Sequence, residues 1–416
     1  LVEARAFNVP PQQGKTTRRR LRFHQAVVRS TYAPPPAAVA STARGGHRHG
    51  ARTFTKKRFR CGAFFASADE HAPSKTADHD GDGLASLERI DVTGLSRSQV
   101  ADLADFSRPC ILTGVLSLSD CESWCDWMLE DLGGATCTFQ IRSNDSGRSE
   151  VFESTLVEFL RGLQEESTHS ESWYLLEESL LELPQARPEL SALLEKPQEL
   201  LGTDEFQLFP PSVRPQNLCA IVGGVGARSF LHGDPMEWMG WNILLEGRKL
   251  WTFLPPLPAI DSALGTYRLA PNAFGSHNVS AGWQSNVDLY QHGITAAGCM
   301  YWPEADDGQE VMQHAVSGIQ EVGDLVLIPP RHWHQVYHLE PSVAVASQYM
   351  DYRVRDRVFR HILNWCGASE DVLQSAKFDA FSPADQIKEV LKVALVARHG
   401  QEKGLEAFAS LDDPFR

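Results

Sequence analysis

Two short segments, about 100 residues apart, contain the side chains of this chain that are best suited to bind a metal ion. In the first segment, His232 and Asp234 flank Gly233. Residues i and i+2 of an extended backbone face the same side, so the imidazole and the carboxylate can point together into a barrel. A second histidine would complete the two-histidine, one-carboxylate set that binds non-haem Fe(II) and leaves positions open for a co-substrate and O₂. A lone His-x-Asp sequence is weak evidence, because a hydrogen-bonded turn also explains it.

The second segment, residues 323–336, predicts a turn, an apolar strand and a Pro-Pro bend that bring a histidine to the start of another strand. An antiparallel jelly roll uses a long separation of this kind to bring two metal-binding strands together. Three histidines, His332, His334 and His338, have the same parity along the chain. Periodicity therefore does not choose between them, and any of them could be an ordinary core or surface histidine.

Lys249 is predicted to lie on an inner strand face, where its charge would need a buried anion as partner. It shares one face of a predicted strand with Trp251 and Phe253, two aromatic side chains that are not expected to be exposed together. An ammonium group on an inner face needs a counter-ion, because an unpaired buried charge costs several kcal/mol. A dicarboxylate co-substrate would supply that counter-ion. The alternative is a lysine at a hairpin end whose charged group reaches solvent.

Short apolar runs separated by turns predict an antiparallel sandwich or barrel in the centre of the chain. The runs are residues 218–225, 228–231, 241–245, 249–254, 325–328 and 342–350. Two further strands are expected before this region, at 87–92 and 109–115. With helices on either side, the expected fold class is α+β.

Helices are predicted before and after the β region. The first spans 96–104, and Ser119 with Glu122 three residues later predicts the start of a second. After the last strand the apolar spacing is helical again. Ser382 predicts the start of a final helix and Gly400 its end.

The charge of the chain is divided unevenly. The first 67 residues contain 14 Lys and Arg and one acidic residue, Glu3, whereas the rest contain 25 basic and 52 acidic residues. Residues 1–85 are expected to be a disordered basic leader and linker, typical of a plastid or mitochondrial transit peptide. A nuclear-localisation signal, which would place the protein in the nucleus, and a solvated tail are the alternatives. The acidic remainder disfavours nucleic acid and favours basic proteins or small molecules as partners, unless the charge serves only solubility.

Composition excludes several classes of protein. No run of about 18 apolar residues occurs, so no membrane-spanning helix is expected. The eight cysteines are scattered without a CxxC pair, which indicates neither a zinc knuckle nor a secreted disulfide framework. The chain is therefore expected to be intracellular. Its 416 residues, 42% of them apolar, can form a sizeable core.

Taken together, these residues resemble the Jumonji C (JmjC) oxygenases, and among them the hydroxylase-like branch of the cupin-8 family. The resemblance is carried by His232-x-Asp234, by Asn242 and Lys249 ten and seventeen residues after that histidine, and by the segment Gly-Asp-Leu-Val-Leu-Ile-Pro-Pro-x-x-Trp-His that ends at His334. It implies a double-stranded β-helix (jelly roll or cupin) at residues 217–352. A helical and mixed part at 86–216 and a helical region at 353–416 would flank it.

The resemblance also implies roles for individual residues. The Fe(II) ligands would be His232, Asp234 and His334. The contacts to 2-oxoglutarate would come from Ser229 and Lys249 at its distal carboxylate, and Asn242 would lie beside the co-substrate or the metal. Two positions depart from the family pattern. His332 stands where an aromatic residue is common, and Ala346 stands where close relatives have a polar residue.

The activity implied by this resemblance is hydroxylation of a protein side chain, or demethylation of a methylated Lys or Arg, with Fe(II), 2-oxoglutarate and O₂. Succinate and CO₂ would be released. The partner would be a protein or peptide, with basic ones as candidates, and the oligomeric state is open. The alternatives are a catalytically inactive cupin scaffold that binds proteins, and an oxygenase of small molecules or RNA. The presence of all three candidate ligands and Lys249 argues against the inactive scaffold.

Overall fold

The computed structural model describes residues 85–411, except 105, 144–148, 167–170, 184–186, 212, 215–217, 265–266, 269–282, 286, 291–310 and 376–381. All described residues belong to one compact unit, Lys57–Arg416. The predicted leader lies outside the described residues, apart from its last residue, Ala85. Its order and its targeting role therefore stay predictions.

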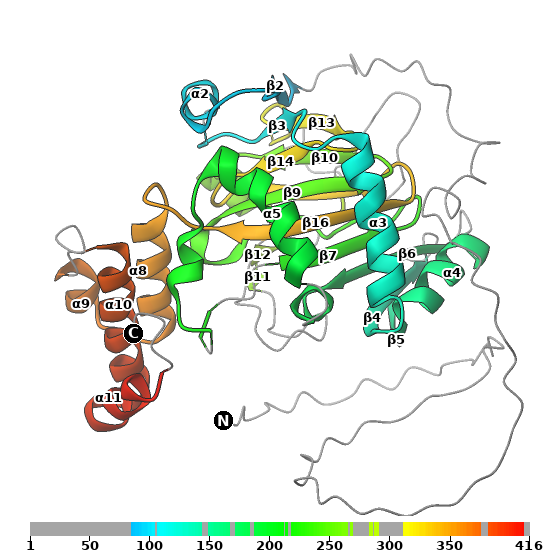
Figure 1. Cartoon of the computed structure of the whole chain (residues 1–416). Coiled ribbons are helices and arrows are strands. Elements are labelled where there is room, and N and C mark those ends of the chain that lie inside the picture. Colours follow the sequence, from blue (N-terminus) through cyan, green and yellow to red (C-terminus); the bar gives the residue numbers. More distant parts are fainter. Residues whose placement is uncertain are drawn as a thin grey trace, which may run out of the picture. The chain divides into compact units, whose positions relative to one another are not determined.

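Two β-sheets form the centre of this unit (Figure 1). The seven-stranded sheet has the order β1 (Ala85–Ser86), β13 (Val316–Gln320), β10 (Lys249–Leu254), β15 (Trp333–His338), β8 (His232–Gly233), β12 (Trp283–Gln284), β11 (Tyr267–Arg268). The nine-stranded sheet has the order β2 (Glu88–Asp91), β3 (Cys110–Thr113), β14 (Leu325–Ile328), β9 (Met239–Glu246), β16 (Ser342–Tyr349), β7 (Leu218–Gly223), β6 (Glu171–Glu177), β4 (Thr136–Ser143), β5 (Ser149–Thr155).

The chain passes back and forth between the sheets. β7, β9, β14 and β16 lie in the larger sheet, and β8, β10, β13 and β15 lie in the smaller one. The described strand pairs are antiparallel except β1 with β13 and β2 with β3. This alternation is that of a double-stranded β-helix, so the predicted α+β fold with a jelly-roll core is confirmed.

An apolar core fills the space between the two sheets. Trp251, Phe253 and Val336 of the smaller sheet pack with Val326 and Ile328 of the larger one. Because side chains alternate along a strand, Lys249 faces the same interior as Trp251 and Phe253. The rings of these two aromatic residues stack at 5.6 Å. The predicted inner face of β10 is thus confirmed.

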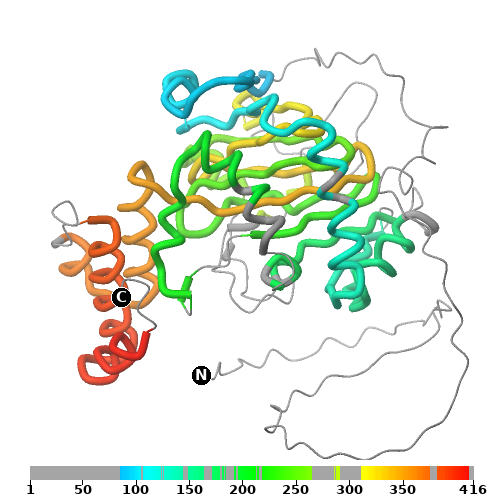
Figure 2. The backbone as a smooth tube through the Cα atoms, viewed as in Figure 1, coloured from blue at the N-terminus to red at the C-terminus, as the bar shows by residue number. Residues whose placement is uncertain are grey.

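Helices cover the outer face of the larger sheet and follow the last strand. Before the barrel they are α2 (Arg97–Leu103), α3 (Leu118–Leu132), α4 (Leu156–Glu166) and α5 (Arg187–Leu201). Figure 1 shows α3 and α5 across this sheet. After β10 comes α6 (Pro258–Ala263), and after β16 come α8 (Arg355–Trp365), α9 (Glu370–Ser375), α10 (Pro383–His399) and α11 (Gln401–Ala409). Figure 2 shows these last four helices grouped together at one side of the sheets.

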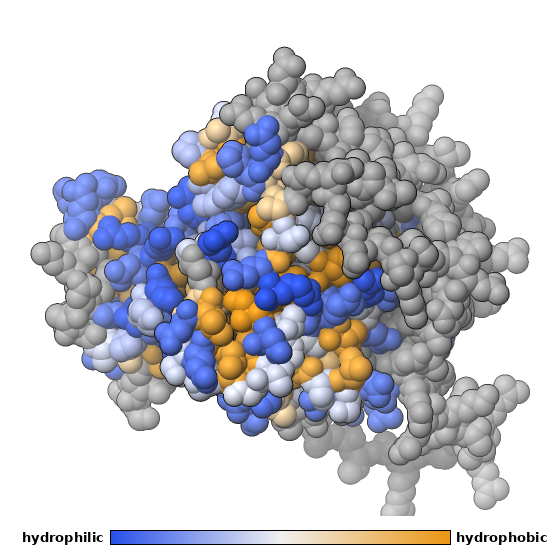
Figure 3. All heavy atoms as spheres, turned by 90° about the horizontal axis from the view of Figure 1, so that it is seen from above, coloured by the Kyte–Doolittle hydropathy of each residue, from blue (hydrophilic) through white to orange (hydrophobic). Residues whose placement is uncertain are grey.

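The described helices and surface can be compared with what a membrane-spanning segment requires. No described helix combines the length and the apolar composition needed to cross a membrane. Seen from above, hydrophilic residues are interspersed with smaller apolar patches over the described part of the surface (Figure 3).

The helix ends test the capping predictions. Ser382 caps α10 by accepting the N–H of Asp385, and Gly400 ends the helix with φ 83°, both as predicted. The predicted cap of α3 at Ser119 is wrong. Ser117 is the N-cap, because its hydroxyl accepts the N–H of Asp120 while the Asp120 carboxylate accepts the N–H of Ser117. Two overlapping Ser-x-x-acid sequences fit the same motif, and this reciprocal pair begins the helix two residues earlier.

One predicted strand also needs correction, and three observed strands were not predicted. Residues 228–231 form no continuous strand, because the two ends of this segment pair with different parts of the chain. Arg228 makes an isolated bridge to Tyr337, whereas the carbonyl of Leu231 accepts the N–H of Ser285. The strand that leads to the candidate ligands, β8, has only two residues. In addition β4, β5 and β6 extend the larger sheet through residues for which no strand was predicted.

Candidate metal centre

The fold brings His232, Asp234 and His334 together. β8 and β15 are antiparallel neighbours, and His334 lies directly opposite His232. Asp234 follows β8 at the start of a short 3₁₀ turn, Pro235–Glu237. One ligand atom from each of the three residues lies within 4.8 Å of the other two. The Asp234 Oδ1 atom is 3.9 Å from the Nε2 atom of each histidine. Donor atoms bound to one ion at about 2.1 Å lie about 3 to 4 Å apart, so one divalent cation fits this set.

Backbone carbonyl groups fix the orientation of both imidazole rings. Nδ1 of His232 lies 2.7 Å from the carbonyl oxygen of Phe230, and Nδ1 of His334 lies 3.1 Å from that of His332. A carbonyl oxygen only accepts hydrogen bonds, so each Nδ1 carries the proton. Each Nε2 therefore keeps its lone pair, as a metal-ligating histidine requires.

The electrostatics of the centre suit a cation. Burial lowers the pKa of His334 well below its usual value, and His232 lowers it further, so the ring is neutral. Burial raises the pKa of the Asp234 carboxyl, although His232 and a hydrogen bond from Trp238 oppose this effect. A bound cation would stabilise the carboxylate in place of the lost water.

The structure distinguishes between His332, His334 and His338, which residue parity alone does not. Among the described residues, the group that could hold a metal contains His334 and neither His332 nor His338. Nδ1 of His332 lies 3.2 Å from the carbonyl oxygen of Pro330. His338 lies further along β15, opposite Lys249, and its Nδ1 shares a 2.7 Å hydrogen bond with the hydroxyl of Ser342.

Two aromatic side chains of β10 lie beside the candidate ligand His334, on the same strand face as Lys249. Phe253 is opposite His334 in the β10–β15 ladder, and its ring lies 5.7 Å from the imidazole. Trp251 lies 6.1 Å from the same imidazole. Both aromatic side chains are buried, and electrostatic interactions are stronger in such low-dielectric surroundings.

Lys249 is the most deeply buried cation near this centre. Its residue is 1% exposed, and in the described part of the chain no carboxylate lies within ion-pair distance of its Nζ. Burial lowers the pKa of Lys249 to about 7, and the weaker effect of Cys219 opposes this change. The inward orientation predicted from the sequence is therefore present. A buried ammonium without a carboxylate favours an anionic ligand.

Asn242 presents an unpaired polar atom in the same interior. The residue is 1% exposed, and its Oδ1 has no hydrogen-bond partner among the described residues. Its neighbour on β16 is Ala346, the residue that departs from the family pattern. A methyl group cannot bond to the amide, which explains the unpaired oxygen.

Two hydroxyl groups complete this part of the interior. Ser229 accepts the N–H of Val336 at 3.1 Å through its hydroxyl oxygen, so its proton stays available to a ligand. Tyr174, which the sequence did not single out, lies on β6 with its ring 5.7 Å from that of His338 in an edge arrangement. Alternation along β6 was the available signal. Trp173 and Leu175 are buried in the core that contains helix residues, so Tyr174 between them faces the barrel.

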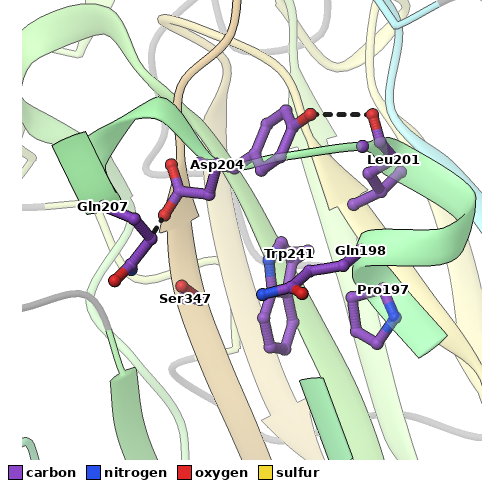
Figure 4. A pocket seen from close by; sticks show the side chains of 9 residues that line it. Pro197, Gln198, Leu201, Asp204, Gln207, Trp241 and Ser347 are labelled. Atoms are coloured by element: carbon purple, nitrogen blue, oxygen red, sulfur yellow. Dashed lines mark hydrogen bonds between the residues drawn. The ribbon is translucent and has the colours of Figure 1, made fainter. Parts of the chain in front are cut away.

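A separate small pocket lies on the other face of the larger sheet (Figure 4). Pro197, Asp204, Trp241 and Ser347 are among its lining residues. Trp241 and Ser347 neighbour Asn242 and Ala346 in sequence, so they point away from the barrel interior. This pocket is therefore distinct from the metal centre.

Comparison with known proteins agrees with this geometry. The family model described as a cupin-like domain matches residues 96–351. The bifunctional arginine demethylase and lysyl-hydroxylase psr-1 of Caenorhabditis elegans is 22% identical over 269 residues, which are 64% of this chain and 61% of that protein. The lysine-specific demethylase JMJ21 of Arabidopsis thaliana is 26% identical over 170 residues, 40% of this chain and 16% of that protein. The arginine-specific demethylase JMJ22 of the same plant is 26% identical over 136 residues, 33% of this chain and 23% of that protein.

The chain thus spans less than two thirds of the length of these curated relatives. The family match, in contrast, covers more than half of this chain and contains all six site residues predicted from the sequence. The chain therefore belongs to the cupin-like domain family of JmjC type.

Proposed function

We propose that this protein is an Fe(II)- and 2-oxoglutarate-dependent dioxygenase that hydroxylates a protein side chain or demethylates a methylated Lys or Arg. Succinate and CO₂ are the co-products. The single observation that carries the proposal is the arrangement of the barrel interior. Three metal-ligating atoms lie within 4.8 Å of one another, and the buried Lys249 shares their interior without a described carboxylate partner.

The donor set supports iron as the metal. His232, Asp234 and His334 supply two neutral imidazoles and one carboxylate, a set that occupies one side of an ion and leaves the other side open. When bound, Fe(II) with 2-oxoglutarate supplies O₂ activation and the oxidation of a substrate C–H bond. The carbonyl groups of Phe230 and His332 keep both imidazoles in the orientation and the tautomer that coordination needs.

The buried polar groups support 2-oxoglutarate as the co-substrate. The Lys249 ammonium would pair with its distal carboxylate, and the Ser229 hydroxyl would donate to the same group. Asn242 would donate through its amide N–H₂ or accept through the unpaired Oδ1. Trp251 and Phe253 are buried apolar residues on the same strand face as Lys249, so a dicarboxylate bound beside them would interact with the cation in low-dielectric surroundings.

A protein with basic side chains is the proposed substrate class. The printed names of the relatives describe arginine and lysine demethylases and a lysyl-hydroxylase. The acidic excess of this chain after residue 67 attracts basic partners and repels nucleic acid. The division into a leader (1–85), an N-terminal part (86–216), a catalytic core (217–352) and a C-terminal helical region (353–416) is part of this proposal.

Succinate release tests this function. The purified chain is incubated with Fe(II), ascorbate and 2-oxoglutarate, with and without Lys- and Arg-rich peptides, some of them methylated. We expect turnover in the wild type, none in His232→Ala or Asp234→Ala, and unchanged turnover in His314→Ala, which replaces an exposed histidine. No turnover in the wild type, together with no binding of 2-oxoglutarate in calorimetry with Mn(II), would support the inactive scaffold instead.

A further inference from the structure

Three residues other than glycine adopt left-handed backbone in the described part of the chain. They are Met236 (φ 57°), Glu237 (φ 55°) and Arg331 (φ 63°). The first two follow the ligand Asp234 within three residues, and the third precedes the ligand His334 by three. Strained backbone of this kind persists only where the surrounding structure over-determines it, and it clusters at functional sites.

The side chain of Arg331 connects the two strained turns. Its Nε lies 3.8 Å from Oε1 of Glu237, and one terminal nitrogen lies 3.8 Å from Oδ2 of Asp261 on α6. The other carboxylate oxygen of Asp261 accepts the indole N–H of Trp333 at 2.7 Å. Trp333 directly precedes His334. One guanidinium group thus joins the turn after Asp234, the turn before His334 and a helix beside them.

Fold stability alone gives little reason for this arrangement. The Arg331 side chain is 50% exposed, and those of Glu237 and Asp261 are 34% and 36% exposed. Exposed ion pairs at such distances contribute little to folding. Glycine at residues 237 and 331 would avoid the backbone strain but would lose the charged side chains. We therefore expect these side chains to serve the candidate metal centre that they flank.

We propose that Arg331 is a positioning residue of the metal centre. Its contacts to Glu237 and Asp261 hold the two turns that carry Asp234 and His334 at the separation that one metal ion requires. This inference rests on the proposed function, because it needs a metal at that centre.

Mn(II) affinity of the full chain, measured by calorimetry, tests the inference. We expect Arg331→Ala to weaken binding about tenfold, as loss of groups that orient metal ligands does. Arg331→Gly is expected to weaken it equally while leaving the Tm of the metal-free protein unchanged or higher, because glycine tolerates this backbone. Glu237→Gln should weaken binding in the wild type but have little further effect in Arg331→Ala. Lys196→Ala, which breaks the exposed 3.1 Å pair with Glu199, is the control and should bind as the wild type does.

A lower metal affinity without a lower Tm in Arg331→Gly distinguishes a positioning role from a purely structural one. Wild-type affinity in both Arg331 variants would overturn the inference while leaving the proposed function intact. A loss of affinity that follows a loss of Tm in every variant would overturn it too. If the wild type binds no Mn(II), the proposed function fails first and this inference with it.

Discussion

His232 and His334 lie opposite each other on neighbouring antiparallel strands, although about 100 positions separate them in the sequence. Their rings are 4.2 Å apart between centroids. Each ring is held from behind by a carbonyl oxygen two residues earlier in its own chain segment. The candidate metal centre therefore depends on one strand register, because a shift of one residue would turn one imidazole to the opposite face.

Replacement of the candidate metal ligand Asp234 should abolish the stabilisation of the folded protein by Mn(II). At a Mn(II) concentration 100 times Kd, linkage predicts that the wild type gains about 2.7 kcal/mol in its free energy of unfolding. Asp234→Asn keeps the side-chain volume and removes the carboxylate, so we expect no gain with metal and no loss of stability without it. Urea denaturation with and without Mn(II) measures both quantities. An equal gain in wild type and variant would place the metal elsewhere.

Lys249 should give the stability of the metal-free protein a specific pH dependence. Its pKa is about 7 in the folded chain, against an ordinary value of 10.5. Between these values the unfolded chain binds more protons, so the free energy of unfolding should rise with pH from 7 to 10. In Lys249→Met this contribution to the rise should be absent, whereas Lys392→Met, at a half-exposed lysine, should keep it. Urea denaturation at pH 7 and pH 9 makes the comparison, and identical slopes for wild type and Lys249→Met would contradict it.

Binding of 2-oxoglutarate should be accompanied by proton uptake above pH 7. A carboxylate beside Lys249 favours the ammonium form and raises the pKa that burial has lowered. Calorimetry at pH 8.5 in two buffers with different ionisation enthalpies, in the presence of Mn(II), measures the number of protons taken up. We expect up to one proton for the wild type. A value of zero would mean that the anion binds away from Lys249.

Asp288 should be important for stability although it lies outside the metal centre. It accepts hydrogen bonds from Arg228, whose side chain is 3% exposed, and from Gln335 beside His334. Burial alone would raise the pKa of Asp288, but Arg228 and Arg142 lower it below its usual value. The stabilisation is thus present above the usual carboxyl pKa and is lost as the pH falls through the lowered one.

Removal of that carboxylate takes away the anion that pairs with the buried guanidinium of Arg228. We therefore expect Asp288→Asn to lower the free energy of unfolding by about 3 to 5 kcal/mol. Glu199→Gln, which breaks an exposed pair, should change it by less than about 1 kcal/mol. Denaturant titration at pH 7 compares the two variants, and equal small losses would show that Asp288 is not needed.

Ala346→Ser should supply the partner that Asn242 lacks. A serine hydroxyl on β16 opposite Asn242 can donate to the unpaired Oδ1, and one such hydrogen bond contributes about 1 kcal/mol. We expect Ala346→Ser to have a higher free energy of unfolding than the wild type when no ligand is bound. Ala344→Ser, two residues along the same strand, provides the comparison, because it buries a hydroxyl away from Asn242. A loss of stability in Ala346→Ser would show that the space between residue 346 and Asn242 has no room for the added oxygen.

Local patterns in the sequence predicted the parts of the site that depend on one strand. The shared face of His232 and Asp234 and the inward orientation of Lys249 follow from residue parity. The choice of His334 among three histidines of equal parity depends on which of them pairs with His232. That choice came from family resemblance, because the register between distant strands has no local signal.

Other features depend on contacts that no single segment contains. Ser117 and Ser119 both precede an acidic residue by three, so only the folded helix start distinguishes them. The left-handed backbone at Glu237 and Arg331 has no sequence signature, because glycine or asparagine usually occupies such positions. Tyr174 becomes part of the barrel interior only because β6 joins the larger sheet beside β7.

A crystal structure of the protein grown with Mn(II) and 2-oxoglutarate tests the central claim most directly, through the anomalous scattering of manganese. We expect one strong peak within about 2.0 to 2.3 Å of Nε2 of His232, an Asp234 carboxylate oxygen and Nε2 of His334. Density for the co-substrate should extend from this peak to the Lys249 ammonium. A peak elsewhere, or no peak at a manganese concentration that saturates binding in solution, would contradict the account.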